Sequence, residues 1–178
     1  MYEESIDLSH LPAEGRNIDR QVHLNAWKLK EPDWESRSDL VFDVNITGNH
    51  RKALIRGKFK AGITARCHRC LQSFDVDLSR NFRVTYLEPD AERFAREEVE
   101  LTDSELEVSY MDGTYLPLHE MIREQIYLSL PMKFLCSADC KGLCPNCGAN
   151  LNEVECDCDR DQMDPRWASL KAIVNELN

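Results

Sequence analysis

Hydrophobic and polar side chains alternate in several short stretches of the first half of the chain. Residues 40–46 place apolar side chains at every second position, which is the period of a strand with one buried face. Gly48-Asn49 then predicts a turn, and residues 55–66 repeat the alternation with apolar side chains on one face and mostly basic ones on the other. Residues 74–78 and 82–86 continue the pattern. We therefore predict antiparallel strands on both sides of a cysteine pair.

The spacing of apolar residues changes to three and four between residues 117 and 130, which predicts one helix that Pro131 ends. A short strand at residues 108–111 precedes it. Residues 164–177 show the same helical spacing behind Asp164-Pro165, a capping residue followed by a first-turn proline. The sequence thus predicts an α+β fold with an antiparallel, β-rich N-terminal part, one middle helix, a cysteine-rich segment and a C-terminal helix.

The distribution of charge suggests a division near residue 115. Residues 87–124 hold twelve acidic residues against three arginines, and within them residues 88–107 lose the apolar periodicity, which is typical of a solvated connection. We expect residues 1–115 to form a β-rich domain that includes the cysteine pair and this acidic connection. Residues 116–178 then hold the middle helix, the cysteine-rich segment and the terminal helix, packed as one unit with the first part.

The location and the general class of the protein follow from what the sequence lacks. No stretch approaches the roughly 20 apolar residues that a membrane span needs, and the first residues lack the basic and apolar regions of a signal peptide. We therefore expect a cytoplasmic protein that does not enter a membrane. The formal net charge of −10 excludes a uniformly basic nucleic-acid coat protein.

Eight cysteines, most of them in close pairs, carry the strongest chemical signal. In a reducing compartment such pairs indicate metal ligands or redox centres rather than a disulfide framework. Six of them follow the spacing C-x3-C-x3-C-x2-C-x8-C-x-C, and C-x2-C turns hold two sulfurs at the angle that tetrahedral zinc requires. We predict two four-cysteine zinc sites, one from Cys144, Cys147, Cys156 and Cys158 and the other from Cys67, Cys70, Cys136 and Cys140.

Ligation by cysteine alone favours closed, structural sites, because catalytic zinc keeps an open position and usually includes histidine or carboxylate ligands. The five histidines are scattered singly, and the sequence contains no H-E-x-x-H motif, phosphate-binding loop or nucleophile motif. We therefore expect no enzymatic activity. Two other interpretations stay open: a thiol-disulfide oxidoreductase that uses Cys67 and Cys70, and a zinc-ribbon module that binds nucleic acid in transcription.

Basic residues gather between Arg51 and Arg83, where nine Lys and Arg residues accompany only Asp75 and Asp77. The alternation places many of them on the solvent face of the predicted sheet. Such a stripe is either a solvated sheet face or a surface for RNA phosphates, and the two arginines nearest the cysteines also suit a role in balancing thiolate charge. The candidates for RNA binding are Arg51, Lys52, Arg56, Lys58, Lys60, Arg66 and Arg69.

Four stretches of the sequence together resemble a known family. They are Cys67-His68-Arg69-Cys70-Leu71, residues 124–131 (E-Q-I-Y-L-S-L-P), residues 140–152 (C-K-G-L-C-P-N-C-G-A-N-L-N) and Asp164-Pro165-Arg166. From about residue 40 onward, the chain resembles the YceD family, the large ribosomal RNA subunit accumulation proteins.

The resemblance implies a bacterial or organellar ribosome biogenesis factor without enzymatic activity, which supports the synthesis, processing or accumulation of 23S ribosomal RNA. Its partner is then the 23S ribosomal RNA precursor or a large-subunit ribosomal protein, and no small-molecule substrate is expected. RNA would contact the basic stripe, whereas a basic ribosomal protein would be held by the acidic surface.

Overall fold

The computed structural model describes residues 5–27, 32–89, 108–111 and 113–158. The chain divides into two compact units, the first made of Met1–Ala65 and Phe74–Met132 and the second of Arg66–Ser73 and Lys133–Asn178. The predicted division of the sequence at residues 115 and 116 stays a prediction; the compact units interleave along the chain. The predicted helix over residues 164–177 and most of the acidic connection lie outside the described residues.

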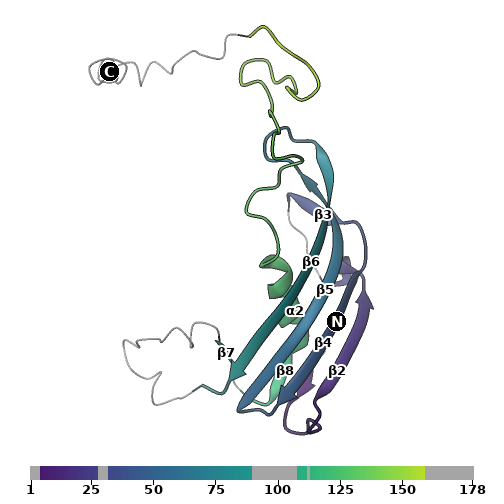
Figure 1. Ribbon diagram of the computed structural model, residues 1–178, viewed down its shortest axis with the longest axis vertical. Coiled ribbons are helices and arrows are strands. Elements are labelled where there is room, and N and C mark those ends of the chain that lie inside the picture. The colour runs from purple at the N-terminus through teal and green to yellow at the C-terminus, as the bar shows by residue number, and fades with distance from the viewer. Residues whose placement is uncertain (1–4, 28–31, 90–107, 112, 159–178) are drawn as a thin grey trace, which may run out of the picture. The chain divides into compact units, whose positions relative to one another are not determined.

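The first unit contains two sheets (Figure 1). The larger has the strand order β2-β4-β5-β6-β7, and β3 also pairs with β5. The smaller consists of β1 and β8, which pair antiparallel. The elements in chain order are β1 (Ser5–Asp7), β2 (Arg16–Val22), the 3-10 helix η1 (Leu24–Trp27), β3 (Trp34–Ser36), β4 (Leu40–Gly48), β5 (Lys52–Arg66), β6 (Ser73–Leu87), β7 (Val108–Tyr110), β8 (Tyr115–Pro117) and α2 (Leu118–Tyr127).

The alternation of side chains along β4 and β5 determines which face of the larger sheet is buried. The apolar positions predicted to share one face are buried, including Phe42 and Phe59, which are among the largest fully buried side chains. The intervening residues Arg56, Lys58 and Lys60 are exposed. Gly48 ends β4 with a φ of 105°, and the Asn49 N–H donates to the Lys52 carbonyl at 3.0 Å, so the predicted turn is confirmed.

Helix α2 adds one mainly apolar face to the core. Its buried residues are Leu118, Met121, Ile122, Gln125 and Ile126, which recur at the predicted spacing of three and four. Arg80 on the core-facing side of β6 donates a hydrogen bond to the Leu128 carbonyl at 2.6 Å, so the end of the helix lies against the sheet. No helix among the described residues is long and apolar enough to cross a membrane.

The structure confirms the α+β class with an antiparallel sheet and corrects several details of the prediction. Residues 74–78 and 82–86 belong to one continuous strand, β6, because the polar residues between them keep the alternation. Helix α2 ends at Tyr127, where N–H groups of the following residues bond to carbonyls three positions back. Strand β7 pairs with β6 in parallel. Strands β1, β2 and β3 fall in residues 1–39, for which the alternation predicted no element.

Candidate metal centre

The first C-x2-C pair lies in the turn between β5 and β6. The Cys67 N–H donates to the Gln72 carbonyl at 2.8 Å, and the Leu71 N–H donates back to the Cys67 carbonyl at 2.9 Å. The Arg69 N–H points at the Cys67 sulfur, with 3.5 Å between nitrogen and Sγ. These bonds fold four residues tightly, so that the sulfurs of Cys67 and Cys70 converge.

The second C-x2-C pair repeats this turn bond for bond. The Cys144 N–H donates to the Ala149 carbonyl at 2.8 Å, and the Gly148 N–H donates to the Cys144 carbonyl at 2.9 Å. The residue after the second cysteine is left-handed in both turns, with φ values of 62° at Leu71 and 74° at Gly148. The two pairs are therefore the same local structure built from different sequences.

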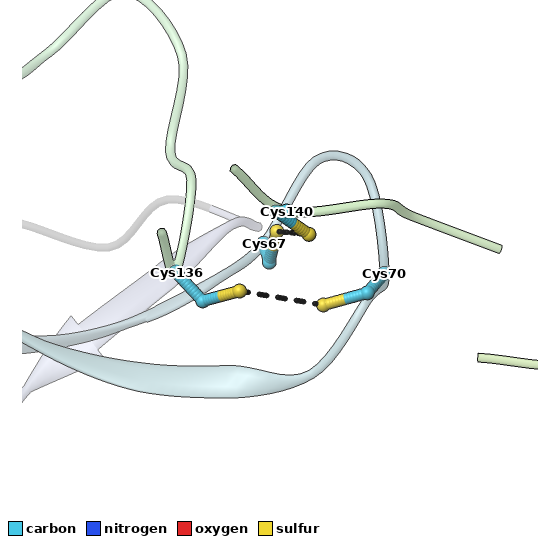
Figure 2. Close-up of side chains that lie close together, drawn as sticks. All are labelled: Cys67, Cys70, Cys136 and Cys140. Carbon is cyan, nitrogen blue, oxygen red and sulfur yellow. Dashed lines mark hydrogen bonds between the residues drawn. The ribbon is translucent and has the colours of Figure 1, made fainter. Parts of the chain in front are cut away.

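Two further cysteines complete the first cluster (Figure 2). The Sγ atoms of Cys67 and Cys140 are 3.8 Å apart, those of Cys70 and Cys136 are 3.6 Å apart, and all four lie within 4.8 Å of one another. Four Zn–S bonds of about 2.3 Å in a tetrahedron place the sulfurs about 3.8 Å apart. The spacing of these atoms therefore fits a tetrahedral metal ion.

The second cluster consists of Cys144, Cys147, Cys156 and Cys158, whose sulfurs also lie within 4.8 Å of one another. Cys144 is buried, whereas Cys147 is exposed at the outer side of its turn. The eight sulfurs thus fall into the two sets of four that the spacing predicts. Each set could hold one metal ion with no position left open for a substrate.

Backbone N–H groups prepare one thiol in each cluster to ionise. Burial raises the pKa of Cys67, but the N–H groups of Cys70, Cys136 and Arg69 outweigh it and lower the pKa to about 6. At Cys144 the N–H groups of Cys147 and Asn146 lower the pKa to about 6. Metal coordination requires thiolates, so the folded turns favour the ligand form.

The remaining thiols show why a cation suits each cluster. Hydrogen bonding to the neighbouring Cys140 sulfur raises the pKa of Cys136 to about 12, and hydrogen bonding to Cys147 raises the pKa of Cys158 to about 12. Four thiolates this close repel one another, so they cannot all ionise by themselves. A divalent cation removes that repulsion, and the donor set therefore fits a metal ion.

Two polar side chains support the first cluster from outside. The Arg69 guanidinium donates to the Cys140 carbonyl at 3.0 Å, and the Arg69 carbonyl accepts from the Leu143 N–H at 3.1 Å. The Asn152 amide donates to the Cys140 sulfur at 3.4 Å, while its Oδ1 accepts from the Lys141 N–H at 2.8 Å. Asn152 belongs to the loop between the two halves of the second cluster, so this loop contributes to both sites.

The structure places the predicted RNA-binding residues in three environments. Lys52, Arg56, Lys58 and Lys60 are exposed on β5, and Arg51 lies in the preceding turn with its Nε 4.0 Å from Glu88. Arg66 and Arg69 belong to the second unit. The Arg69 guanidinium donates hydrogen bonds to the carbonyls of Ala138 and Cys140, so it stabilises the segment that carries the cysteines.

Sequence reasoning missed two residues of this site, Leu71 and Asn152. Both stand in the stretches that carry the family resemblance, but the alternation and cysteine spacing assign them no role. The signal for Leu71 was its position, which is that of Gly148 in the other turn. Asn152 carries no such signal. Its amide bonds to the sulfur of Cys140, twelve positions earlier, and no short-range spacing in the sequence indicates that contact.

Comparison with known proteins gives consistent results. A family model described as "Large ribosomal RNA subunit accumulation protein YceD" matches residues 55–174. A protein of Arabidopsis thaliana named "Large ribosomal RNA subunit accumulation protein YCED homolog 1, chloroplastic" is 25% identical over an alignment of 165 residues that covers 82% of this chain and 51% of that protein. Its namesake in Zea mays is 25% identical over an alignment of 174 residues that covers 85% of this chain and 59% of that protein.

An uncharacterized protein of Mycobacterium tuberculosis is 30% identical over 135 residues, which are 76% of this chain and 62% of that protein. The chain therefore spans between about half and three fifths of the length of the curated relatives that it matches. No solved structure matches the chain.

Proposed function

The chain belongs to the YceD family of large ribosomal RNA subunit accumulation proteins, and from this premise we propose that it is a non-enzymatic factor in the assembly of the large ribosomal subunit. It supports the synthesis, processing or accumulation of 23S ribosomal RNA. The observation that carries the proposal is the match over residues 55–174, which includes all eight cysteines, most of β5 and all of β6.

Within this proposal zinc occupies both cysteine clusters. Cys67, Cys70, Cys136 and Cys140 hold one ion, and Cys144, Cys147, Cys156 and Cys158 hold the other. Four thiolate ligands at tetrahedral spacing support this assignment. Zinc supplies a cross-link between distant parts of the chain. Two closed sites give no place for a reacting molecule, and this supports a role without catalysis.

The direct partner is the 23S ribosomal RNA precursor, a large-subunit ribosomal protein, or both, in the cytoplasm. The exposed basic side of β5 suits RNA, and the net charge of −10 suits a basic protein. The test is purification of the tagged protein from growing cells after mild crosslinking, with RNA and proteins identified from one sample. We expect enrichment of precursor 23S RNA or large-subunit proteins; neither being enriched overturns the proposal.

A thiol-disulfide oxidoreductase is the competing function, and the lowered pKa of Cys67 is the observation in its favour. Alkylation of the purified protein separates the two. Thiols that bind zinc stay unreactive until a chelator removes the metal, whereas a redox pair is alkylated at once and cycles between dithiol and disulfide. Immediate alkylation of Cys67 in zinc-loaded protein favours the oxidoreductase.

A further inference from the structure

A row of polar side chains crosses the solvent face of the larger sheet. Asn17 on β2 lies opposite Asn45 on β4, and Asn45 lies opposite Arg56 on β5. The Asn45 amide donates to the Asn17 Oδ1 at 2.6 Å, which fixes the orientation of both amides. The row therefore begins as an ordered set of side chains on three strands. Figure 1 shows these strands, β2, β4 and β5, side by side in the sheet.

The pairing of β5 with β6 extends this row to Arg83. The Glu88 N–H donates to the Arg51 carbonyl at 3.0 Å at one end of the hairpin, and the Thr64 hydroxyl donates to Asp75 at 3.0 Å near the other. Both contacts fit one antiparallel register, in which Arg56 lies opposite Arg83. A Cβ at Gly57 would lie 2.5 Å from the Phe82 ring, as the same register requires.

Two arginines opposite each other on adjacent strands repel, which is an unfavourable arrangement for a sheet. Within the part of the chain that the structure describes, neither Arg56 nor Arg83 has an ion pair or a hydrogen bond from its side chain. Two other cations have partners: Lys58 on β5 lies 3.3 Å from Asp43, and Arg37, directly after β3, pairs with Asp75. Among the described residues, the opposed pair is thus left without an ion-pair partner, whereas Lys58 and Arg37 each have one.

The two arginines border a shallow hollow of about 670 Å³ in the sheet face. Asn17, Asn45 and Asn81 also line it, together with Lys58 and Asp43. The Asp43 carboxylate is compensated by its ion pair with Lys58 at 3.3 Å, so amide groups and one neutralised acid accompany the two guanidinium groups. Guanidinium groups bind phosphate oxygens through paired hydrogen bonds, and amides bond to sugar hydroxyls or base edges. The hollow therefore combines guanidinium and amide donors that suit a nucleotide.

We propose that Arg56 and Arg83 bind a backbone phosphate of RNA in this hollow, with the asparagines contacting the adjoining nucleotide. The inference rests on the proposed function and names the RNA contact of the protein. Of the basic candidates in the sequence, it selects Arg56 and adds Arg83. Lys60 lies two residues beyond Lys58 on the same exposed face of β5, and it extends the positive surface for a neighbouring phosphate.

The test measures binding of a fluorescein-labelled, 30-nucleotide single-stranded RNA by anisotropy at several salt concentrations, using the full chain loaded with zinc. We expect the double variant Arg56→Gln/Arg83→Gln to bind about tenfold more weakly. The slope of log affinity against log salt falls by about 0.7 for each phosphate that the variant no longer neutralises. The matched control is Arg37→Gln, which removes an arginine that lies directly after β3 and is paired with Asp75, and leaves affinity and slope unchanged.

Three results overturn the inference: wild-type affinity in the double variant, equal weakening in the control, or displacement of the RNA by polyglutamate as effectively as by unlabelled RNA. The double variant relieves the repulsion between the arginines, so it melts at the wild-type temperature or above, which separates weaker binding from unfolding. Crosslinked purification of the double variant distinguishes the two proposals. If the double variant binds RNA in vitro as well as the wild type does, and large-subunit precursors co-purify with the wild type and the double variant alike, this inference fails and the proposed function stands.

Discussion

At the scale of single residues, the two C-x2-C turns place different residues, Leu71 and Gly148, in the same left-handed backbone conformation. Leu71 is the one residue other than glycine with a positive φ in the described part of the chain, and its side chain is 56% exposed. A left-handed conformation costs a residue with a Cβ about 1–2 kcal/mol. The hydrogen bonds of the turn hold Leu71 there, because packing of an exposed side chain cannot.

We predict that Gly148→Ala destabilises the second cluster by about 1–2 kcal/mol. A Cβ at this position meets no atom within 4 Å, so the cost comes from the backbone alone. Chemical denaturation of the zinc-loaded protein measures the free energy of unfolding. The control is Leu71→Asn, which suits the left-handed conformation and leaves the protein as stable or more stable. Equal stability of Gly148→Ala and the wild type contradicts the prediction.

We also predict that Asn152→Ala weakens metal binding by the first cluster about tenfold, because residues that bond to a metal ligand typically contribute that much. The amide bonds to the Cys140 sulfur at 3.4 Å and lies outside the set of ligands. Competition with a chromophoric chelator measures the affinity. Glu153→Gln, one residue further along the same loop, is the control: it keeps the side-chain oxygen that accepts a hydrogen bond from the Gln72 amide, and we expect wild-type affinity. Equal weakening in both variants assigns the effect to the loop rather than to the amide.

At the scale of elements, the β5–β6 hairpin depends on a close approach between Gly57 and Phe82. The ring of Phe82 fills the space above Gly57, and its centroid lies 6.4 Å from that of Phe59. Glycine at this position therefore serves packing, since even a single methyl group would overlap the ring. This approach also holds β5 and β6 in the register that brings Arg56 opposite Arg83.

We predict that Gly57→Val lowers the free energy of unfolding by about 1–3 kcal/mol, the usual cost of overpacking a core. The new side chain displaces Phe82, so near-ultraviolet circular dichroism changes along with the melting temperature. The paired variant Gly57→Val/Phe82→Leu restores space and recovers part of the stability. A single variant with wild-type stability contradicts the close approach.

At the scale of the whole molecule, the cysteine clusters differ in how much chain they enclose. The first joins Cys67 to Cys140, which are 73 positions apart in the sequence. The second joins residues of one short segment, Cys144 to Cys158. Closing a longer loop removes more entropy from the unfolded chain, so a metal in the first cluster stabilises the fold more.

We predict that Cys67→Ser and Cys144→Ser each lose one zinc ion by native mass spectrometry, and that Cys67→Ser is the less stable. The difference in loop length corresponds to about 1–2 kcal/mol, or roughly 3–6 °C in melting temperature. Retention of two ions by either variant contradicts the ligand sets. Equal melting temperatures contradict the role of the long loop.

The sequence by itself determined the features that depend on neighbours along the chain. Alternation placed the buried face of β4 and β5, and the spacing of three and four found the apolar face of α2. The two C-x2-C turns followed from their spacing, because such a turn is a local structure. Each of these signals repeats within a few residues, so no knowledge of distant contacts was needed. The partners of Cys67 and Cys70, which lie about 70 positions away, followed only from dividing eight cysteines into two sets of four.

Only the tertiary structure decided which distant segments meet. It joined β7 to β6 in parallel, paired β1 with β8, and brought the Asn152 amide to the Cys140 sulfur. It also set the register that opposes Arg56 to Arg83. Strand alternation repeats every two residues and is the same for every partner, so it fixes the face of a side chain but not what lies opposite it.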